Sequence, residues 1–235
     1  MGQQADNTKV ETLDLDEMLS SLLFLTDAQW GLYAFSREPV RQKFSIPERI
    51  RLAQQAEECG RSFAGELNEK AAGRSMREYA EQMGITVEYL PIPGDGAQVL
   101  FAQFFPPNKI RIYDDCLNKA EQFLPVGNGI GINRREEIAN ILLSHELFHW
   151  LEEQNKNGIF TKQEKVQLWS IGPLKYSAPI SCLGEIAAMA FTQELCGLSF
   201  SPYLLDVLLV YGYNPAAATN LYRGILRVAG NIALM

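Results

Sequence analysis

Apolar residues recur at helical spacing through most of the chain, and the spacing changes only in one central stretch. Intervals of three and four predict helices over residues 13–35, 46–72 and 75–83. The second of these opens at Ser45 and Pro47, an order that favours a helix start. Apolar and polar positions then alternate, which is typical of half-buried strands. This alternation predicts three strands, over residues 85–90, 98–104 and 109–113.

The segments between the expected strands are short and rich in turn-forming residues. Residues 91–96 hold two prolines and two glycines, and residues 106–108 read Pro-Pro-Asn. Such residues favour tight turns, and consecutive strands joined by turns pair most simply as an antiparallel meander. We therefore expect an α+β fold that is mostly helical and contains a small three-stranded antiparallel sheet.

Helical spacing returns in the second half of the chain. The glycine-rich stretch 127–132 matches neither a dinucleotide-binding nor a phosphate-binding motif, and we interpret it as a plain loop. Asn133, with Glu136 three residues later, resembles a capping box that opens a helix ending near residue 154. Asn214 is placed to cap the last helix. The other helices are expected over residues 117–123, 184–196, 202–210 and 215–228.

Composition narrows the class of protein. The 235 residues are 47% hydrophobic and 21% charged, as in ordinary globular proteins, and the net charge of −7 disfavours a nucleic-acid partner. No apolar stretch approaches the roughly 20 residues of a membrane span, and the first residues lack the pattern of a secretion signal. The cysteines form no CxxC pair. We therefore expect a cytoplasmic location, reduced thiols and no membrane partner.

The helix expected to open at Asn133 carries the motif HExxH, at His145, Glu146 and His149. Residues four apart lie on one face of a helix, so both imidazoles can bind one zinc ion. Glu146 lies beside that face, where its carboxylate can take a proton from an attacking water molecule. The alternative is a chance match with two core histidines. These are the only histidines, however, and two placed at random would stand four apart in about one sequence of a hundred.

A catalytic zinc site needs a third protein ligand. No third histidine exists, which excludes the longer HExxHxxGxxH motif, so a carboxylate must complete the site. Glu152 and Glu153 follow too far along the same helix to converge with His145 on one metal. Asp206 and Glu194 are possible ligands. We favour Glu185, because it opens a strongly apolar helix where a carboxylate needs a partner, although it could simply face the helix dipole.

These residues together resemble the ImmA/IrrE family of bacterial and phage metallopeptidases. In that family the HExxH helix is followed by a helix of the form ExxAxxFAxxLL. Thr192 and Cys196 replace the usual Ala and second Leu of that form, and Phe148 replaces a frequent Gly of HELGH. The segment before the HExxH helix, residues 116–131, is longer than is usual in that family and is a candidate lid or substrate wall. The resemblance covers roughly residues 46–200, including a helix-to-strand entry over residues 76–87, and the second helix matches at Glu185, Ala188, Phe191 and Leu195.

The resemblance implies a zincin-like endopeptidase that needs Zn²⁺ and cuts a protein or peptide, with a transcriptional repressor as the characteristic substrate. It implies His145, His149 and Glu185 as metal ligands and Glu146 as the catalytic residue. We divide the chain into a helical extension (1–45), the metallopeptidase domain (46–200) and C-terminal helices packed on it (201–235).

Two other functions remain open from sequence: a non-hydrolytic protein-binding module, and a structural protein with an accidental motif that binds no zinc. No helix-turn-helix is evident that would tie the chain to a regulatory role. For a peptidase, the oxyanion stabiliser could be Tyr176, Tyr203 or Tyr211.

Overall fold

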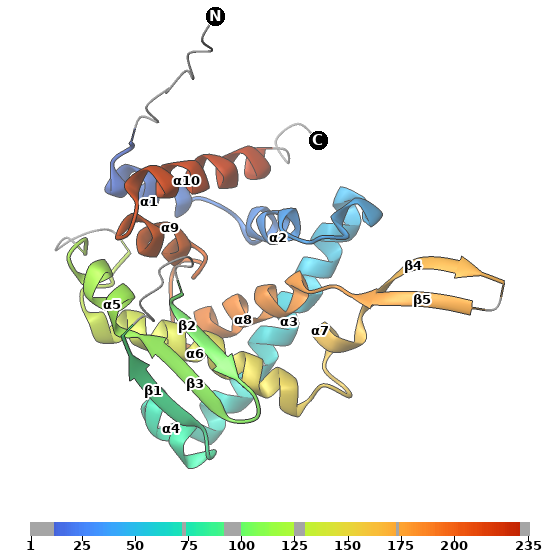
Figure 1. The fold of residues 1–235 in the computed structure, drawn as a ribbon, viewed down its shortest axis with the longest axis horizontal. Coiled ribbons are helices and arrows are strands. Elements are labelled where there is room, and N and C mark those ends of the chain that lie inside the picture. The colour runs from blue at the N-terminus through green and yellow to red at the C-terminus, as the bar shows by residue number, and fades with distance from the viewer. Residues whose placement is uncertain (1–11, 72–73, 92–99, 125–129, 173, 231–235) are drawn as a thin grey trace, which may run out of the picture.

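The computed structural model describes residues 12–71, 74–91, 100–124, 130–172 and 174–230, and its helices and strands define an α+β fold (Figure 1). The helices are α1 (Leu15–Leu22), α2 (Asp27–Ser36), the 3-10 turn η1 (Arg41–Lys43), α3 (Ile46–Ala71), α4 (Met76–Gln82), α5 (Asp114–Glu121), α6 (Arg135–Gln154), α7 (Phe160–Gln163), α8 (Cys182–Leu195), α9 (Leu204–Tyr211) and α10 (Pro215–Gly230). The strands are β1 (Thr86–Leu90), β2 (Ala102–Phe105), β3 (Lys109–Tyr113), β4 (Lys165–Ile171) and β5 (Leu174–Pro179).

The prediction of a single helix over residues 13–35 is wrong, because this segment forms two helices, α1 and α2. The Thr26 side chain accepts a hydrogen bond from the backbone N–H of Gln29, and the Gln29 side chain accepts one from the N–H of Thr26. This capping box starts a new helix inside a continuous apolar pattern. The predictions for α3 and α4 are confirmed, and Ser75 forms the corresponding box with Glu78 at the start of α4.

The three-stranded sheet is mixed, so the antiparallel meander is also wrong. Its strand order is β1-β3-β2, with β1 parallel and β2 antiparallel to β3. The central place belongs to β3, whose Ile110 and Ile112 are fully buried. Alternation shows which residues of a strand face the core, but it does not encode the neighbouring strand or its direction. The strand predicted from residue 98 begins at Ala102, and residues 92–99 lie outside the described part of the chain.

Two predicted helix starts are displaced. The helix α6 begins at Arg135, and its cap is the carboxylate of Glu137, not the pairing of Asn133 with Glu136. Oε2 of Glu137 accepts hydrogen bonds from the backbone N–H groups of Asn133 (2.7 Å) and Arg134 (3.4 Å). The end of α6 at Gln154 agrees with the prediction.

The helix predicted over 117–123 begins earlier, at Asp114, with two aspartates in its first turn where the helix dipole favours them. Most of the predicted loop 127–132 lies outside the described residues. Residues 130–132 of that loop form no helix or strand.

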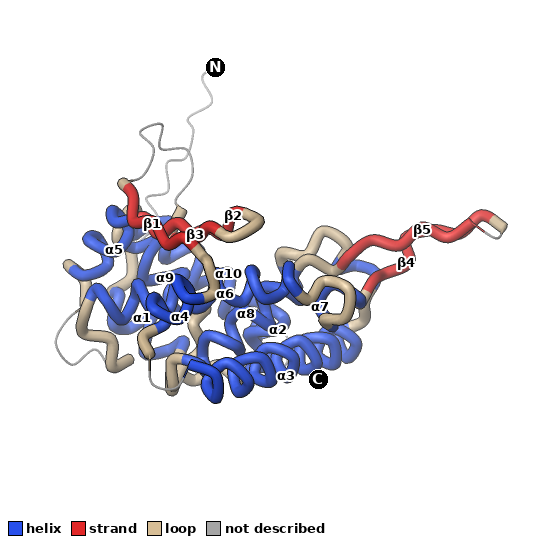
Figure 2. The backbone as a smooth tube through the Cα atoms, turned by 90° about the horizontal axis from the view of Figure 1, so that it is seen from below, coloured by secondary structure: helices blue, strands red, loops and turns tan. Residues whose placement is uncertain are grey.

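The helices pack around one hydrophobic core, and the sheet lies on one side of this helical body (Figure 2). The core residues come from both ends of the chain as well as from the centre. The predicted helices near residues 184–196, 202–210 and 215–228 are found as α8, α9 and α10. Asn214 caps α10 as predicted, accepting a hydrogen bond from Ala217. Over the described residues, the structure contains no helix with the length and apolar character needed to cross a membrane.

The hairpin of β4 and β5 was not predicted, and it projects from the helical body as an arm (Figures 1 and 2). The register shifts between Gln167 and Trp169, which interrupts the alternation that would have revealed β4. Beyond this shift, Trp169 stacks on Tyr176 across the strands, and both are about half exposed. The arm therefore adds little to the core.

Candidate metal centre

Two helices bring the three predicted metal ligands together. His145 and His149 lie one turn apart on α6, with their Nε2 atoms 3.1 Å from each other. Glu185, in the first turn of α8, places Oε2 3.4 Å from Nε2 of His145 and Oε1 3.5 Å from Nε2 of His149. Among the described residues this is the one group of three or more potential ligands whose donor atoms all lie within 4.8 Å.

The packing of α8 explains why Glu185 reaches the histidines. The helix lies against α3 and α6, and its N-terminus is fixed by the buried carboxylate of Glu38, from the segment after α2. Oε2 of Glu38 accepts hydrogen bonds from the Ser181 hydroxyl (2.9 Å) and the backbone N–H of Cys182 (3.0 Å). An acceptor at unpaired N–H groups stabilises a helix start. The first turn of α8, and Glu185 with it, is thereby held in place.

The electrostatics of the cluster are complementary. Burial raises the pKa of Glu185, but hydrogen bonding and attraction from His145, with further attraction from His149, outweigh this effect and lower it to about 2. Burial lowers the pKa of His145, but the Glu185 carboxylate raises it to about 9. The carboxylate is therefore ionised and favours positive charge at this point. Two imidazoles and one carboxylate form a ligand set of open zinc sites.

Glu146 faces the same cleft as the three ligands, and only 9% of it is exposed. Its Oε2 accepts a hydrogen bond of 2.6 Å from the backbone N–H of Phe104 in β2. This bond orients the carboxylate, and it shows that the Phe104 N–H points away from the neighbouring strand β3. Sequence reasoning could not find this partner, because a backbone group leaves no residue-type signal.

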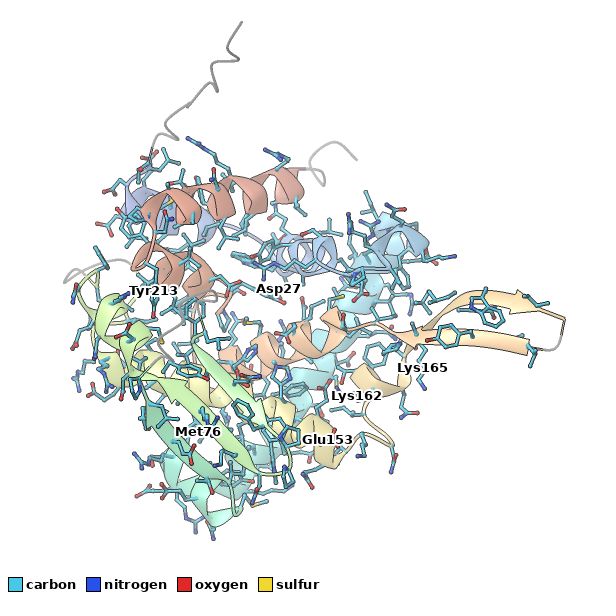
Figure 3. All side chains as sticks on the ribbon, viewed as in Figure 1. Asp27, Met76, Glu153, Lys162, Lys165 and Tyr213 are labelled. Carbon is cyan, nitrogen blue, oxygen red and sulfur yellow. The ribbon has the colours of Figure 1, made fainter. Side chains whose placement is uncertain are left out.

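The cleft has a volume of about 770 Å³ and is bounded by elements from distant parts of the chain. Residues 100–104 form one wall, and Arg37, Tyr203 and Asp206 line another. Glu153 and Lys162, both labelled in Figure 3, mark the side formed by α6 and α7. The described residues of the candidate lid 116–131 do not line the cleft, and this wall is instead formed by the segment leading into β2.

The rejected and alternative ligands occupy other places. Asp206 lines the cleft, but its Oδ2 contacts the Tyr33 hydroxyl (3.3 Å) and Nη1 of Arg37 (3.4 Å). Glu194 is exposed near the end of α8 and does not line the cleft. Glu152 is buried and lies on the Nδ1 side of His149, away from the Nε2 atom that faces Glu185.

Of the three candidate oxyanion stabilisers, only Tyr203 lines the cleft. Its hydroxyl is buried and has no hydrogen-bond partner among the described residues, and burial raises its pKa far above the usual range. Tyr176 lies on the projecting hairpin, and Tyr211 packs edge-to-face on Phe123. Tyr203 is thus the one predicted tyrosine that lines the cleft.

Comparisons of the chain with protein-family models, with curated proteins and with solved structures find no match. The residues of the site are therefore the basis for assigning a function.

Proposed function

We propose that this protein is a zinc-dependent endopeptidase with a zincin-like site, as its resemblance to the ImmA/IrrE metallopeptidases implies. The observation that carries this proposal is the convergence of His145, His149 and Glu185 beside the carboxylate of Glu146, in one cleft. In this assignment the first three residues hold zinc and Glu146 is the catalytic base.

The ligand set fits zinc on chemical grounds. Zinc accepts imidazole nitrogen and carboxylate oxygen, and catalytic sites supply three protein ligands and leave a further position open. The half-exposed Glu185 side chain, on the cleft side of the cluster, is compatible with such an open position. When bound, zinc would supply a Lewis acid that activates water and polarises the peptide carbonyl.

Glu146 would perform the proton transfers. Its carboxylate takes a proton from the attacking water and then gives it to the leaving amine nitrogen, so that one residue serves as base and acid. The hydrogen bond from the Phe104 N–H holds the carboxylate toward the cleft while one of its oxygens carries out this exchange. Tyr203 is the proposed donor to the developing oxyanion, because its buried hydroxyl lacks a partner.

The wall formed by β2 supports a polypeptide substrate. The carbonyl of Phe101 accepts a hydrogen bond from the N–H of Tyr113, the last residue of β3, whereas the N–H of Phe104 points away from β3. By the alternation of a strand, the backbone groups of Ala102 also face the open edge. An extended peptide could add to this edge through its own backbone groups. The expected substrate is thus a protein or peptide segment, and a transcriptional repressor is the substrate class that the resemblance implies.

The test is hydrolysis of unstructured polypeptides by the zinc-loaded protein and by Glu146→Gln. The variant is nearly isosteric but cannot act as a base, so it should retain zinc and lose about 10²- to 10⁴-fold in rate. Equal rates in the two proteins would refute the assignment of Glu146. Stoichiometric zinc with no hydrolysis by the wild type, on peptides or on a repressor encoded nearby, would favour the non-hydrolytic binding module instead.

A further inference from the structure

Glu152 is a buried carboxylate at the end of the helix that carries both histidines. Only 5% of its side chain is exposed, which is unusual for an acidic residue. Its Oε1 accepts a hydrogen bond of 2.6 Å from the Thr161 hydroxyl, and its Oε2 lies 2.8 Å from Nζ of Lys162. Burial of a charge is costly unless it is paired in this way. The buried carboxylate of Glu152 is therefore stabilised by dedicated partners, which suggests that its position has a role.

The same carboxylate faces His149 from the side opposite the cluster. Oε2 of Glu152 lies 3.6 Å from Nδ1 of His149, within ion-pair range and slightly beyond hydrogen-bond distance. Nε2 of the same imidazole faces Glu185. Within the part of the chain that the structure describes, the ion pairs of His149 are with Glu152, at Nδ1, and with Glu185, at Nε2. Glu152 is thus placed to decide which nitrogen of His149 carries the proton.

Glu152 also contacts the helix that supplies Glu185. A Cβ atom added to Gly184, the residue before Glu185, would lie 2.8 Å from Oε1 of Glu152. The absence of a side chain at this position allows the carboxylate to lie against the first turn of α8. The Glu152 side chain therefore contacts the proposed ligand His149 directly, and it packs beside Gly184, the neighbour of the proposed ligand Glu185.

We propose that Glu152 is a positioning residue for the metal centre. Its carboxylate accepts a hydrogen bond from the Nδ1–H of His149, which leaves the lone pair of Nε2 free to bind the metal, and it packs against the first turn of α8. Thr161 and Lys162 of α7 hold Glu152 in this position and compensate its charge. The inference depends on the proposed zinc site, and it adds a residue that the HExxH motif does not contain.

A carboxylate on the outer nitrogen of a metal-binding histidine fixes the tautomer and the ring orientation. Loss of such a partner typically lowers metal affinity by about 10- to 100-fold. Glu152→Gln keeps the volume and one acceptor oxygen, whereas Glu152→Leu keeps the bulk without any acceptor. If Glu152 acts through His149, zinc affinity should fall in the order wild type, Gln variant, Leu variant. A role in packing alone would lower the unfolding midpoints of the variants but would leave the tautomer of His149 unchanged.

The first experiment is a competition titration of zinc against a chelator for the full chain and its variants. Glu66→Gln is the matched control, because Glu66 is an exposed carboxylate on α3 whose ion pair, among the described residues, is with Lys70. We expect control affinity equal to wild type, a loss of about 10-fold or more for Glu152→Leu, and a similar loss for Gly184→Ala, whose methyl group displaces the carboxylate. Wild-type affinity in all the Glu152 and Gly184 variants would overturn the proposal.

The second experiment uses the metal-free protein, so that it remains informative even if the zinc site is refuted. Long-range ¹H–¹⁵N correlation spectra report the protonation of each imidazole nitrogen. We expect the Nδ1 proton of His149 to be retained in wild type and in Glu66→Gln, and lost or averaged by exchange in Glu152→Leu. An unchanged His149 spectrum in folded Glu152→Leu would contradict the positioning role. A wild type that binds no zinc would instead contradict the proposed function.

Discussion

At the scale of single residues, the cluster depends on a carboxylate that is only partly buried. The Glu185 side chain is 54% exposed, yet it lies within 3.5 Å of both histidines, because the capped start of α8 fixes its backbone. Asp206, which is more buried, is instead engaged by Arg37 and Tyr33.

Replacement of Glu185 should therefore affect metal binding more than stability. We expect Glu185→Ala to lower zinc affinity by at least about 10-fold, because one of three protein ligands is removed, while the folded state persists. Glu194→Ala, which also removes one carboxylate from the same helix, should leave the zinc affinity unchanged. Asp206→Ala should lower the unfolding midpoint without loss of zinc. Affinities measured by chelator competition and midpoints by urea unfolding check these results, and a loss of zinc in Asp206→Ala alone would contradict the choice of ligand.

The local sequence pattern was sufficient to predict the residues of the cluster, because most of them are brought together by the spacing of residues along one helix. His145, Glu146 and His149 share one helix, and Glu185 stood out as a carboxylate in an apolar helix. The partners of these residues were not predictable. Phe104 contributes a backbone N–H, and Glu38 caps a helix that starts 144 positions away from it. Such long-range contacts arise from packing and leave no periodic signal.

At the scale of elements, the site depends on how closely α8 packs against α3. A Cβ atom at Gly60 of α3 would lie 2.1 Å from the carbonyl oxygen of Ala187, so a side chain there would push the helices apart. On the same helix, Gly65 is exposed and has nothing within 4 Å of its added Cβ. The two glycines form a matched pair in which only one is required by packing.

We expect Gly60→Ala to destabilise the protein by about 3 kcal/mol, because the methyl group overlaps backbone atoms of α8. Zinc affinity should fall with it, since Glu185 is carried by the displaced helix. Gly65→Ala should stabilise the protein by about 0.5–1 kcal/mol, because alanine is the better residue in a helix interior. Urea unfolding of the two variants measures both effects. Similar stabilities would show that α3 and α8 do not pack as described.

Most helices could be predicted from the spacing of apolar residues, whereas the break between α1 and α2 and the pairing of the strands could not. Thr26 and Gln29 interrupt a pattern that remains apolar on both sides, so spacing alone suggests continuity. The sheet order is decided by the burial of β3 between its neighbours, which involves residues far apart in sequence. The hairpin escaped prediction because its register shift disrupts alternation at Gln167–Trp169.

At the scale of the whole molecule, both ends of the chain contribute to the cleft. Arg37, which follows α2, and Asp206 of α9 form an ion pair of 3.4 Å in its wall, and Tyr33 contacts both side chains. Trp30 stacks on Tyr203 in the same region, with ring centroids 5.5 Å apart. The helices flanking the central region therefore help to shape the site, in addition to covering the core. A shortened chain lacking either end would lose part of this wall.

The central claim is that His145, His149 and Glu185 bind zinc, and elemental analysis of the purified full chain tests it most directly. After incubation with zinc and removal of the excess, wild type should contain one zinc ion per chain, and His149→Ala should contain far less, because an imidazole ligand is lost from an otherwise folded protein. The Glu66→Gln control should match wild type. No stoichiometric zinc in wild type, or equal zinc in wild type and His149→Ala, would contradict the account.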